Sequence, residues 1–172
     1  DKKGIYMHFK TQETENDQKM DGGQLDVERK LYYRELIARF GHHVALNWNL
    51  GEENDIWSEL NDPNNSLVKS YAQYIKDIDP YDHHIVIHTY PGQQDEVYDD
   101  LIGNQSVLTG PSVQTGINNV HRDVKKWVEA SAASGKKWVV ANDEQGGANA
   151  GVSVDSDYPD GNLPSNRGVS DN

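Results

Sequence analysis

Short apolar segments alternate with longer amphipathic segments along this chain, and several of the apolar segments end on polar residues. The apolar segments are rich in β-branched and aromatic residues, which is typical of buried strands. They predict strands over residues 4–9, 44–50, 83–90, 106–109 and 137–141. The amphipathic segments carry apolar residues at helical spacing. They predict helices over 24–40, 67–78 and 119–133, and a short helix or turn over 94–101.

This β-α-β-α-β order predicts right-handed crossovers and a parallel sheet of the α/β class. The strands begin about 33 residues apart, close to the roughly 31 residues per unit of an eightfold (β/α)8 TIM barrel. An open doubly wound sheet fits this spacing almost as well. No Gly-x-Gly-x-x-Gly motif and no phosphate-binding loop follows any predicted strand, which argues against the open sheet. We therefore expect part of a barrel, with about five βα units.

Two of the predicted strands end in acidic residues. The segment from Asn47 to Asn54 finishes with Glu52 and Glu53, and the segment from Asn142 to Gln145 contains Asp143 and Glu144. Acids at the ends of buried strands are costly to bury without a partner. We expect the two tips to face each other and to hold a pair of catalytic carboxylates. The simpler alternative is that they are solvated acids, in a chain that has 28 Asp and Glu residues.

Composition narrows the class of partner. The 172 residues suit one domain, in which residues 146–172 are expected to form mostly irregular loop. A net charge of −12 argues against nucleic acid and anionic membranes as partners. No apolar run is long enough to cross a bilayer, and the absence of cysteine excludes a thiolate nucleophile. Four Trp and nine Tyr suit stacking on sugar rings, and equally suit an ordinary amphipathic surface.

With both tips located, the chain resembles the retaining glycoside hydrolases of clan A. It is most similar to bacterial barrel proteins that carry an N-terminal domain of unknown function and a C-terminal domain named for collagen binding. The resemblance rests on the segments 47–54 and 142–145. It implies that the chain covers the third to seventh barrel strands of a longer, secreted or periplasmic protein. The remaining strands, or another chain, would then be needed to close the barrel.

The resemblance also implies a chemistry, namely hydrolysis of a polysaccharide or oligosaccharide by double displacement without a cofactor. Glu144 corresponds to the nucleophile and Glu52 to the acid/base. The charge of Glu144 and burial near Trp48 are expected to keep Glu52 protonated. The usual Asn-Glu pair is displaced, because Gly51 precedes Glu52. Glu53 is therefore kept as the substitute for Glu52.

Further residues are expected to bind the substrate. They are His88, Tyr90, Gln114, Asn49 and Asp143. A packed histidine at position 88 and ordinary loop polarity at position 114 are the alternatives. His8 and Lys10 end the first predicted strand and are also expected on the substrate side. If the displaced Asn-Glu pair has cost the protein its turnover, the chain is a non-catalytic carbohydrate-binding protein or a structural barrel fragment.

Two acidic stretches are compatible with calcium. Glu13, Glu15 and Asp17 alternate, so an extended backbone would place all three carboxylates on one side. The stretch 155–160 departs from the spacing of an EF-hand loop and is expected to be an irregular loop. Residues 42–43 and 83–84 are two pairs of histidines, and each pair precedes a predicted strand. They are expected at the N-terminal end of the barrel strands, the end that is associated with stability.

Overall fold

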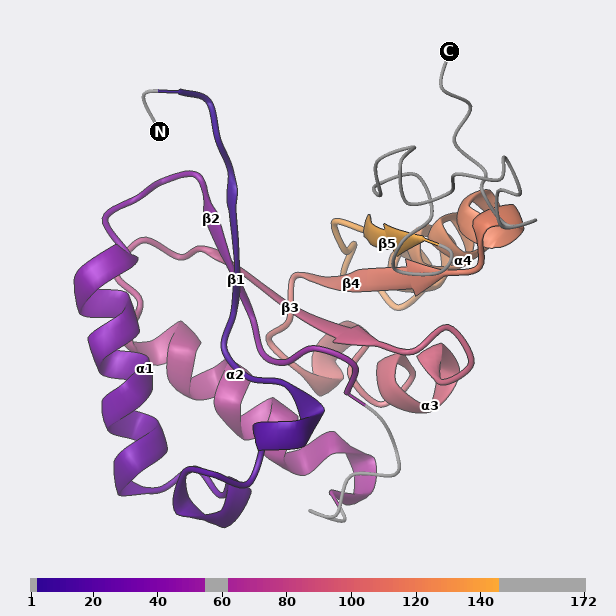
Figure 1. The fold of residues 1–172 in the computed structure, drawn as a ribbon. Helices are drawn as coiled ribbons and strands as arrows, with labels where there is room; N and C mark the ends of the chain where they lie inside the picture. Colours follow the sequence, from indigo (N-terminus) through magenta and orange to yellow (C-terminus); the bar gives the residue numbers. More distant parts are fainter. Residues whose placement is uncertain (1–2, 55–61, 146–172) are drawn as a thin grey trace, which may run out of the picture.

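A computed structural model of the chain describes residues 3–54 and 62–145. Five strands form one all-parallel sheet whose spatial order follows the sequence, and the sheet curls into a half-barrel (Figure 1). The strands are β1 (Met7–Lys10), β2 (Leu46–Asn49), β3 (His84–Thr89), β4 (Gly110–Thr115) and β5 (Ala141–Gln145). The predicted α/β fold, a partial barrel with about five βα units, is confirmed.

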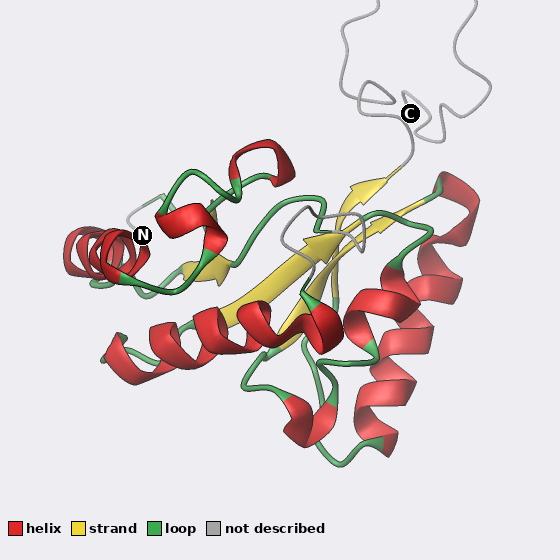
Figure 2. Ribbon diagram, turned by 90° about the horizontal axis from the view of Figure 1, so that it is seen from below, coloured by secondary structure: helices red, strands yellow, loops and turns green. Residues whose placement is uncertain are grey.

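Four α-helices connect the strands and lie along one face of the sheet (Figure 2). They are α1 (Val27–Phe40), α2 (Ser66–Ile78), α3 (Gln94–Tyr98) and α4 (Val120–Ala133). In the described part of the chain, β1 and β5 each have one neighbouring strand. The half-barrel is therefore open along both edges.

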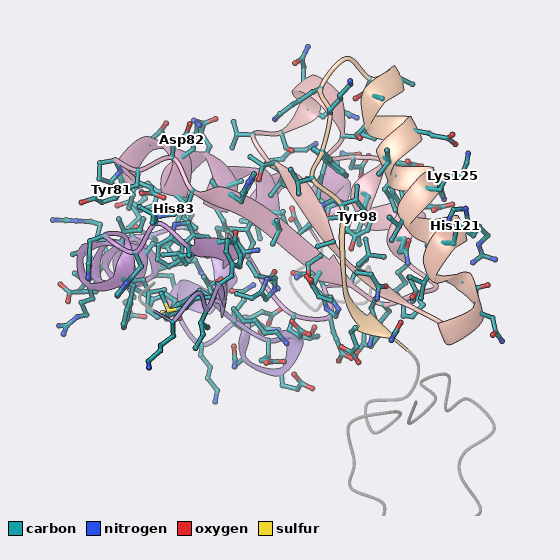
Figure 3. All side chains as sticks on the ribbon, turned by 90° about the horizontal axis from the view of Figure 1, so that it is seen from above. Tyr81, Asp82, His83, Tyr98, His121 and Lys125 are labelled. Carbon is teal, nitrogen blue, oxygen red and sulfur yellow. The ribbon has the colours of Figure 1, made fainter. Side chains whose placement is uncertain are left out.

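The hydrophobic core lies between the sheet and the helices. Ile85 and Ile87 of β3 point into it, and Tyr98 packs edge-on against Trp127 of α4 with ring centroids 5.0 Å apart (Figure 3). Side chains alternate along a strand, so His88 faces the opposite side, away from the helices. The same alternation separates the packing face of the sheet from the face that carries the candidate site.

The fourth strand lies later in the chain than the apolar pattern predicts. Residues 106–109 were expected to pair, but the ladder with β3 runs from Gly110, and all six residues of β4 are buried. Gly110 and Pro111 are typical of a turn, which explains the wrong prediction. A Cβ atom at Gly110 would lie 2.0 Å from the carbonyl oxygen of Val139, so glycine is needed here for close backbone approach.

The fifth strand is displaced in the same direction. The apolar residues 138–140 precede β5, and the mostly polar sequence Ala141–Gln145 pairs with β4. Asp143 and Glu144 therefore lie within a strand and not beyond its end. Backbone pairing does not require apolar side chains, and this strand has few of them because it lies at the edge of the described sheet.

Arg29 lies in a run of charged residues on the first helix, and it is nevertheless fully buried. Its guanidinium donates to the side chain of Gln12 and to the carbonyl of Asp17, and it lies 4.8 Å from the ring centre of Tyr71. Its amide also donates to Asp21 (2.8 Å). This arginine therefore ties the loop that follows β1 to α1 and α2.

Replacing Arg29 with methionine should lower the free energy of unfolding by about 3 kcal/mol, because two buried acceptors lose a charged donor. Urea unfolding of the purified chain measures this loss. Lys30→Met is the matched control, since Lys30 is the exposed neighbour on the same helix and should change stability by less than about 0.5 kcal/mol. Equal effects of the two substitutions would contradict the anchoring role.

A second buried polar cluster lies at the opposite end of the strands, near the labelled His83 (Figure 3). The carboxylate of Asp79 accepts hydrogen bonds from the Trp48 indole (2.9 Å), the Tyr81 amide (3.0 Å) and the His83 amide (3.2 Å), and lies 2.7 Å from Nδ1 of His83. Burial by itself raises the pKa of Asp79, but these bonds together lower it below the ordinary 3.8. These contacts agree with the expectation that the region around residues 83–84 serves stability.

Since the folded state has the lower pKa, ionised Asp79 stabilises the protein fully above the unfolded value. That stabilisation is lost as the pH falls through the folded value. Asp79→Asn should lower the free energy of unfolding by about 1–3 kcal/mol at neutral pH. The gap between wild type and variant should close below about pH 4. Urea unfolding at stepped pH measures both curves, and a gap that stays constant in acid would refute the assignment.

Candidate functional site

All five strands contribute to one pocket at the end of the sheet where they terminate. It has a volume of about 290 Å³ and lies on the face away from the helices. It is lined by His8, Lys10, Glu52, His88, Ser112, Asp143 and Glu144. Both acidic tips reach it, as the sequence predicts. The tips lie far apart in the sequence and meet because the carboxyl ends of parallel strands share one rim.

Glu52, His88 and Glu144 form the centre of the pocket. One carboxylate oxygen of each glutamate and one ring nitrogen of the histidine lie within 4.8 Å of one another. Nε2 of His88 is 3.8 Å from a carboxylate oxygen of Glu144. Retaining glycosidases hold their two carboxyl groups about 5–5.5 Å apart, and inverting enzymes about 6.5–9.5 Å. One oxygen of Glu52 and one of Glu144 lie within 4.8 Å of each other, which is near enough for the retaining arrangement.

Glu52 is the more buried carboxylate, with 9% of its side chain exposed against 30% for Glu144. One of its oxygens lies 2.7 Å from Nζ of Lys10 and 3.3 Å from Nδ1 of His88. The other oxygen is buried and has no hydrogen-bond partner among the described residues. Glu52 therefore has one neutralised oxygen and one oxygen that is open to a ligand.

The surroundings of His88 favour its neutral form, with a donor directed to the pocket. Burial lowers its pKa, against the opposing influence of the Glu52 and Glu144 charges. The amide of Glu53 donates to Nδ1 at 3.0 Å, so in the neutral ring the proton sits on Nε2. That Nε2 is buried and has no hydrogen-bond partner within the described part of the chain. An unsatisfied buried donor of this kind calls for an acceptor that a bound molecule supplies.

The irregularity between β4 and β5 explains how two consecutive acids reach one pocket. Gln114 pairs with Glu144 and Val113 with Asn142, so Asp143 is the additional residue of a β-bulge. A regular strand would point Asp143 and Glu144 to opposite faces. The bulge turns both toward the pocket, where Asp143 accepts a hydrogen bond from the hydroxyl of Ser112.

Asn49 lies next to the pocket and contacts one of the residues that line it. It is fully buried, its amide nitrogen lies 3.0 Å from Nε2 of His8, and its side-chain oxygen accepts from the amide of Gly51 (3.2 Å). His8 in turn lies 3.8 Å from a carboxylate oxygen of Asp143. The prediction that His8 and Lys10 lie on the substrate side agrees with their place in the pocket lining, and Asn49 orients His8.

Four residues expected at the site lie outside the pocket lining, namely Asn49, Glu53, Tyr90 and Gln114. The side chain of Glu53 accepts a hydrogen bond from the hydroxyl of Tyr90 (2.7 Å). Gln114 is buried, and its carbonyl accepts from the Gln94 side chain (2.8 Å). Ser112 takes the place expected for Gln114, because it pairs with His88 across the sheet. That register follows from the displaced start of β4, which the apolar pattern did not reveal.

Trp48 was expected to shield Glu52, and this expectation is wrong. Its indole lies in the core on the helix side, where it bonds to Asp79. Trp48 is followed by Asn49 on the other face, as strand alternation requires. The loop after β1 lies beside Glu52, because its Gln12 carbonyl accepts a hydrogen bond from the Glu52 amide (3.0 Å).

The acidic loop after β1 does not have the extended backbone on which a calcium site was predicted. Thr14–Asn16 forms a 3₁₀ turn, so Glu13 and Glu15 are exposed while Asp17 is buried. The second stretch considered, residues 155–160, lies outside the described residues.

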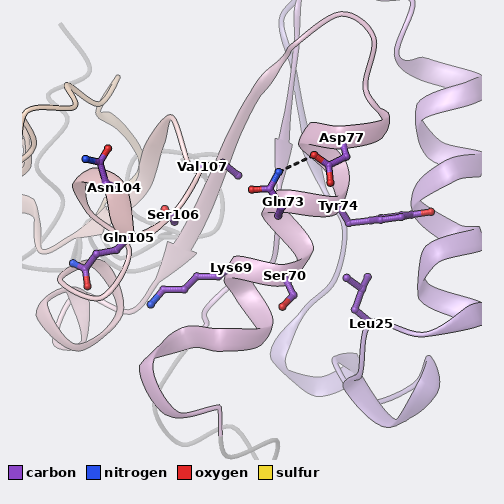
Figure 4. Close-up of a pocket in the computed structure, with 10 residues that line it drawn as sticks. All are labelled: Leu25, Lys69, Ser70, Gln73, Tyr74, Asp77, Asn104, Gln105, Ser106 and Val107. Atoms are coloured by element: carbon purple, nitrogen blue, oxygen red, sulfur yellow. Dashed lines mark hydrogen bonds between the residues drawn. The ribbon is translucent and has the colours of Figure 1, made fainter.

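A second hollow lies on the helix side, between α2 and the segment 104–107 (Figure 4). Its volume is about 520 Å³, and Lys69, Gln73 and Tyr74 form part of its wall. Gln73 is already bonded to Asp77 (2.7 Å). No buried side-chain atom without a partner lies in this wall, among the residues described. The pocket at the strand ends is therefore the stronger candidate.

Comparison with known proteins finds no matching family model, no similar curated protein and no similar solved structure. Over residues 3–54 and 62–145, no helix is long and apolar enough to cross a membrane. The function is therefore argued from the chemistry of the pocket.

The Lys10–Glu52 contact should couple the two residues energetically. In the wild-type protein, Lys10→Met leaves the mostly buried carboxylate of Glu52 without its cation. In the Glu52→Gln variant, the same substitution breaks no charge pair. Because Lys10 is 45% exposed, we expect a coupling energy of only about 1–2 kcal/mol in a double-mutant cycle of urea unfolding. Additive effects of the two substitutions would show that the contact contributes nothing.

Proposed function

We propose that this protein is a glycoside hydrolase that acts on a polysaccharide or oligosaccharide with retention of configuration. The observation that carries the proposal is the approach of Glu52 and Glu144 to within 4.8 Å in one pocket at the strand ends. Two carboxylates at this spacing can reach opposite ends of one glycosidic bond. The resemblance of the two acidic segments to clan A enzymes supports the same conclusion.

The proposed reaction has two displacements. In the first, a carboxylate oxygen of Glu144 attacks the anomeric carbon, while Glu52 gives its proton to the departing glycosidic oxygen. In the second, Glu52 takes a proton from water, and the resulting hydroxide displaces Glu144 from the anomeric carbon. The half-exposed Lys10 turns away when Glu52 is protonated and returns when Glu52 is ionised.

The unpartnered groups of the pocket favour a hydroxyl-bearing substrate. The Nε2–H group of His88 needs an acceptor, and the free oxygen of Glu52 can accept from a donor. A hydroxyl group is both donor and acceptor, so a single sugar hydroxyl can satisfy both groups. Asp143, Glu144 and Glu52 outnumber the single lysine, which disfavours anionic sugars. We therefore propose an uncharged sugar at this position.

The open sheet edges bear on how the active protein is assembled. The pocket volume of about 290 Å³ is at the small end of the range for ligand sites. We propose that the remaining barrel strands, or another chain, pair with β1 and β5 and deepen the pocket. Secretion or export to the periplasm is proposed from the family resemblance alone.

A non-catalytic carbohydrate-binding protein is the second candidate. The ion pair between Lys10 and Glu52 favours it, because an ionised Glu52 carboxylate carries no proton that it can donate to a leaving group. The two candidates share the ligand class and differ in turnover.

Hydrolysis should depend on two of the three candidate glutamates. Glu52→Gln and Glu144→Gln should each lower the turnover of aryl β-glycosides and soluble polysaccharides by about 10²-fold or more. Glu53→Gln is the matched control and should retain most of the activity, since Glu53 lies outside the pocket lining. Proton NMR of the first-formed sugar should show the anomer of the substrate.

Glycan binding measured by calorimetry separates the two candidates. Binding without turnover in the wild-type protein would favour the carbohydrate-binding alternative. A product of inverted configuration would overturn the double-displacement mechanism. Loss of turnover in Glu53→Gln with full activity in Glu52→Gln would exchange the roles of these two residues.

A further inference from the structure

Glu53 has a backbone conformation that is uncommon for a side-chain-bearing residue. Its φ angle is 47°, in the left-handed region that glycine prefers. Three contacts hold it there. The hydroxyl of Thr14 donates to its carbonyl (2.7 Å), the hydroxyl of Tyr90 donates to its carboxylate (2.7 Å), and its amide donates to Nδ1 of His88 (3.0 Å). Strained residues that are held by several elements are concentrated at functional sites.

The third contact decides the chemistry of the histidine. With Nδ1 accepting a hydrogen bond, the proton of the neutral ring must lie on Nε2, which faces the pocket beside Glu144. The opposite tautomer would direct an Nδ1 proton toward the Glu53 amide hydrogen. It would also leave that amide without its acceptor. The Glu52 oxygen near Nδ1 already lies 2.7 Å from Lys10, so it does not require that proton.

We infer that Glu53 is a positioning residue whose left-handed backbone fixes His88 as the Nε2–H tautomer, and that this makes the pocket a hydroxyl-binding site rather than a metal site. Glu52, His88 and Glu144 have the composition and spacing of a three-residue metal centre. Metal-bound histidines usually donate their second ring N–H, whereas Nδ1 of His88 accepts from the Glu53 amide, so this tautomer disfavours a metal at Nε2. The proton on Nε2 serves as a fixed donor for a substrate oxygen.

This inference refines the ligand class of the proposed function, yet its first test involves no substrate. Nitrogen-15 NMR of histidine-labelled protein reports the tautomer, with His88 assigned by comparison with His88→Gln. We expect a pyrrole-type shift for Nε2 and a pyridine-type shift for Nδ1 in the wild-type protein at neutral pH. A pyrrole-type Nδ1 would overturn the inference, whether or not the protein hydrolyses glycosides.

Substitutions at position 53 test the backbone and not the side chain. Glu53→Gly keeps the amide and favours a positive φ, so it should preserve the wild-type pattern of shifts. Glu53→Val opposes a positive φ and should move both nitrogens toward the average of the two types. Asp82→Val is the matched control, because Asp82 has a φ of 56° in an exposed loop. It should destabilise the fold and leave the His88 shifts unchanged.

Zinc alone supplies a second measurement, which stands even if Glu53→Val fails to fold. Calorimetric titration with Zn²⁺ should give the same affinity for the wild-type protein and for His88→Gln. A loss of about tenfold or more in His88→Gln would show that His88 is a ligand and would overturn the inference. Such a loss would not decide whether the protein is a glycosidase, because the turnover measurements test that proposal separately.

Discussion

Parallel pairing of five strands in chain order is the constraint on which the rest of this structure depends. Because every strand runs in the same direction, residues within β1, β3, β4 and β5 and a residue that follows β2 gather at one rim. Lys10, Glu52 and Glu144 are far apart in the sequence and meet there in a single pocket. The helices cover the other face, so the polar side chains of the rim do not disturb the core. The same backbone arrangement thus keeps the residues of the hydrophobic core apart from the residues of the candidate site.

Some buried polar groups are paired within the fold, and others are not. At the far end of the strands, Asp79 accepts several hydrogen bonds, and on the helix side the guanidinium of Arg29 is bonded to the loop that it anchors. At the rim, His88 Nε2 and one oxygen of Glu52 are buried without partners among the described residues. Leaving a buried donor or acceptor unpaired costs about 1–3 kcal/mol. Other buried atoms of the described residues also lack a partner, among them Nε of Arg29 and the hydroxyl of Tyr33, but these two belong to residues that line the pocket. They are therefore the two that a molecule bound in the pocket can pair with.

The sequence predicted the parallel half-barrel, most helix boundaries and the meeting of the two acidic segments, because each depends on local pattern and on the order of elements. It failed where backbone geometry decided the outcome. The turn-like Gly110 lies in β4 because Val139 approaches closely, and the bulge at Asp143 turns two consecutive acids to one side. The burial of Arg29 could not be predicted either, because helical periodicity does not reveal a loop that bonds to the helix from 12 residues away. Ser112 was missed as a pocket residue for the same reason as β4, since its position follows from the register.

The ambiguity between Glu52 and Glu53 illustrates how such geometry becomes chemistry. Two adjacent glutamates after a strand are equivalent in any sequence pattern, and only one of them lines the pocket. The left-handed turn at Glu53 sends its side chain to Tyr90 and its amide to His88, while Glu52 continues the strand direction and pairs with Glu13 of the neighbouring loop. The second glutamate acts on the site through its backbone, where its side-chain charge is not needed. Glycine or asparagine could adopt the same φ, so the carboxylate of Glu53 has a separate purpose, which is to hold Tyr90 against the turn.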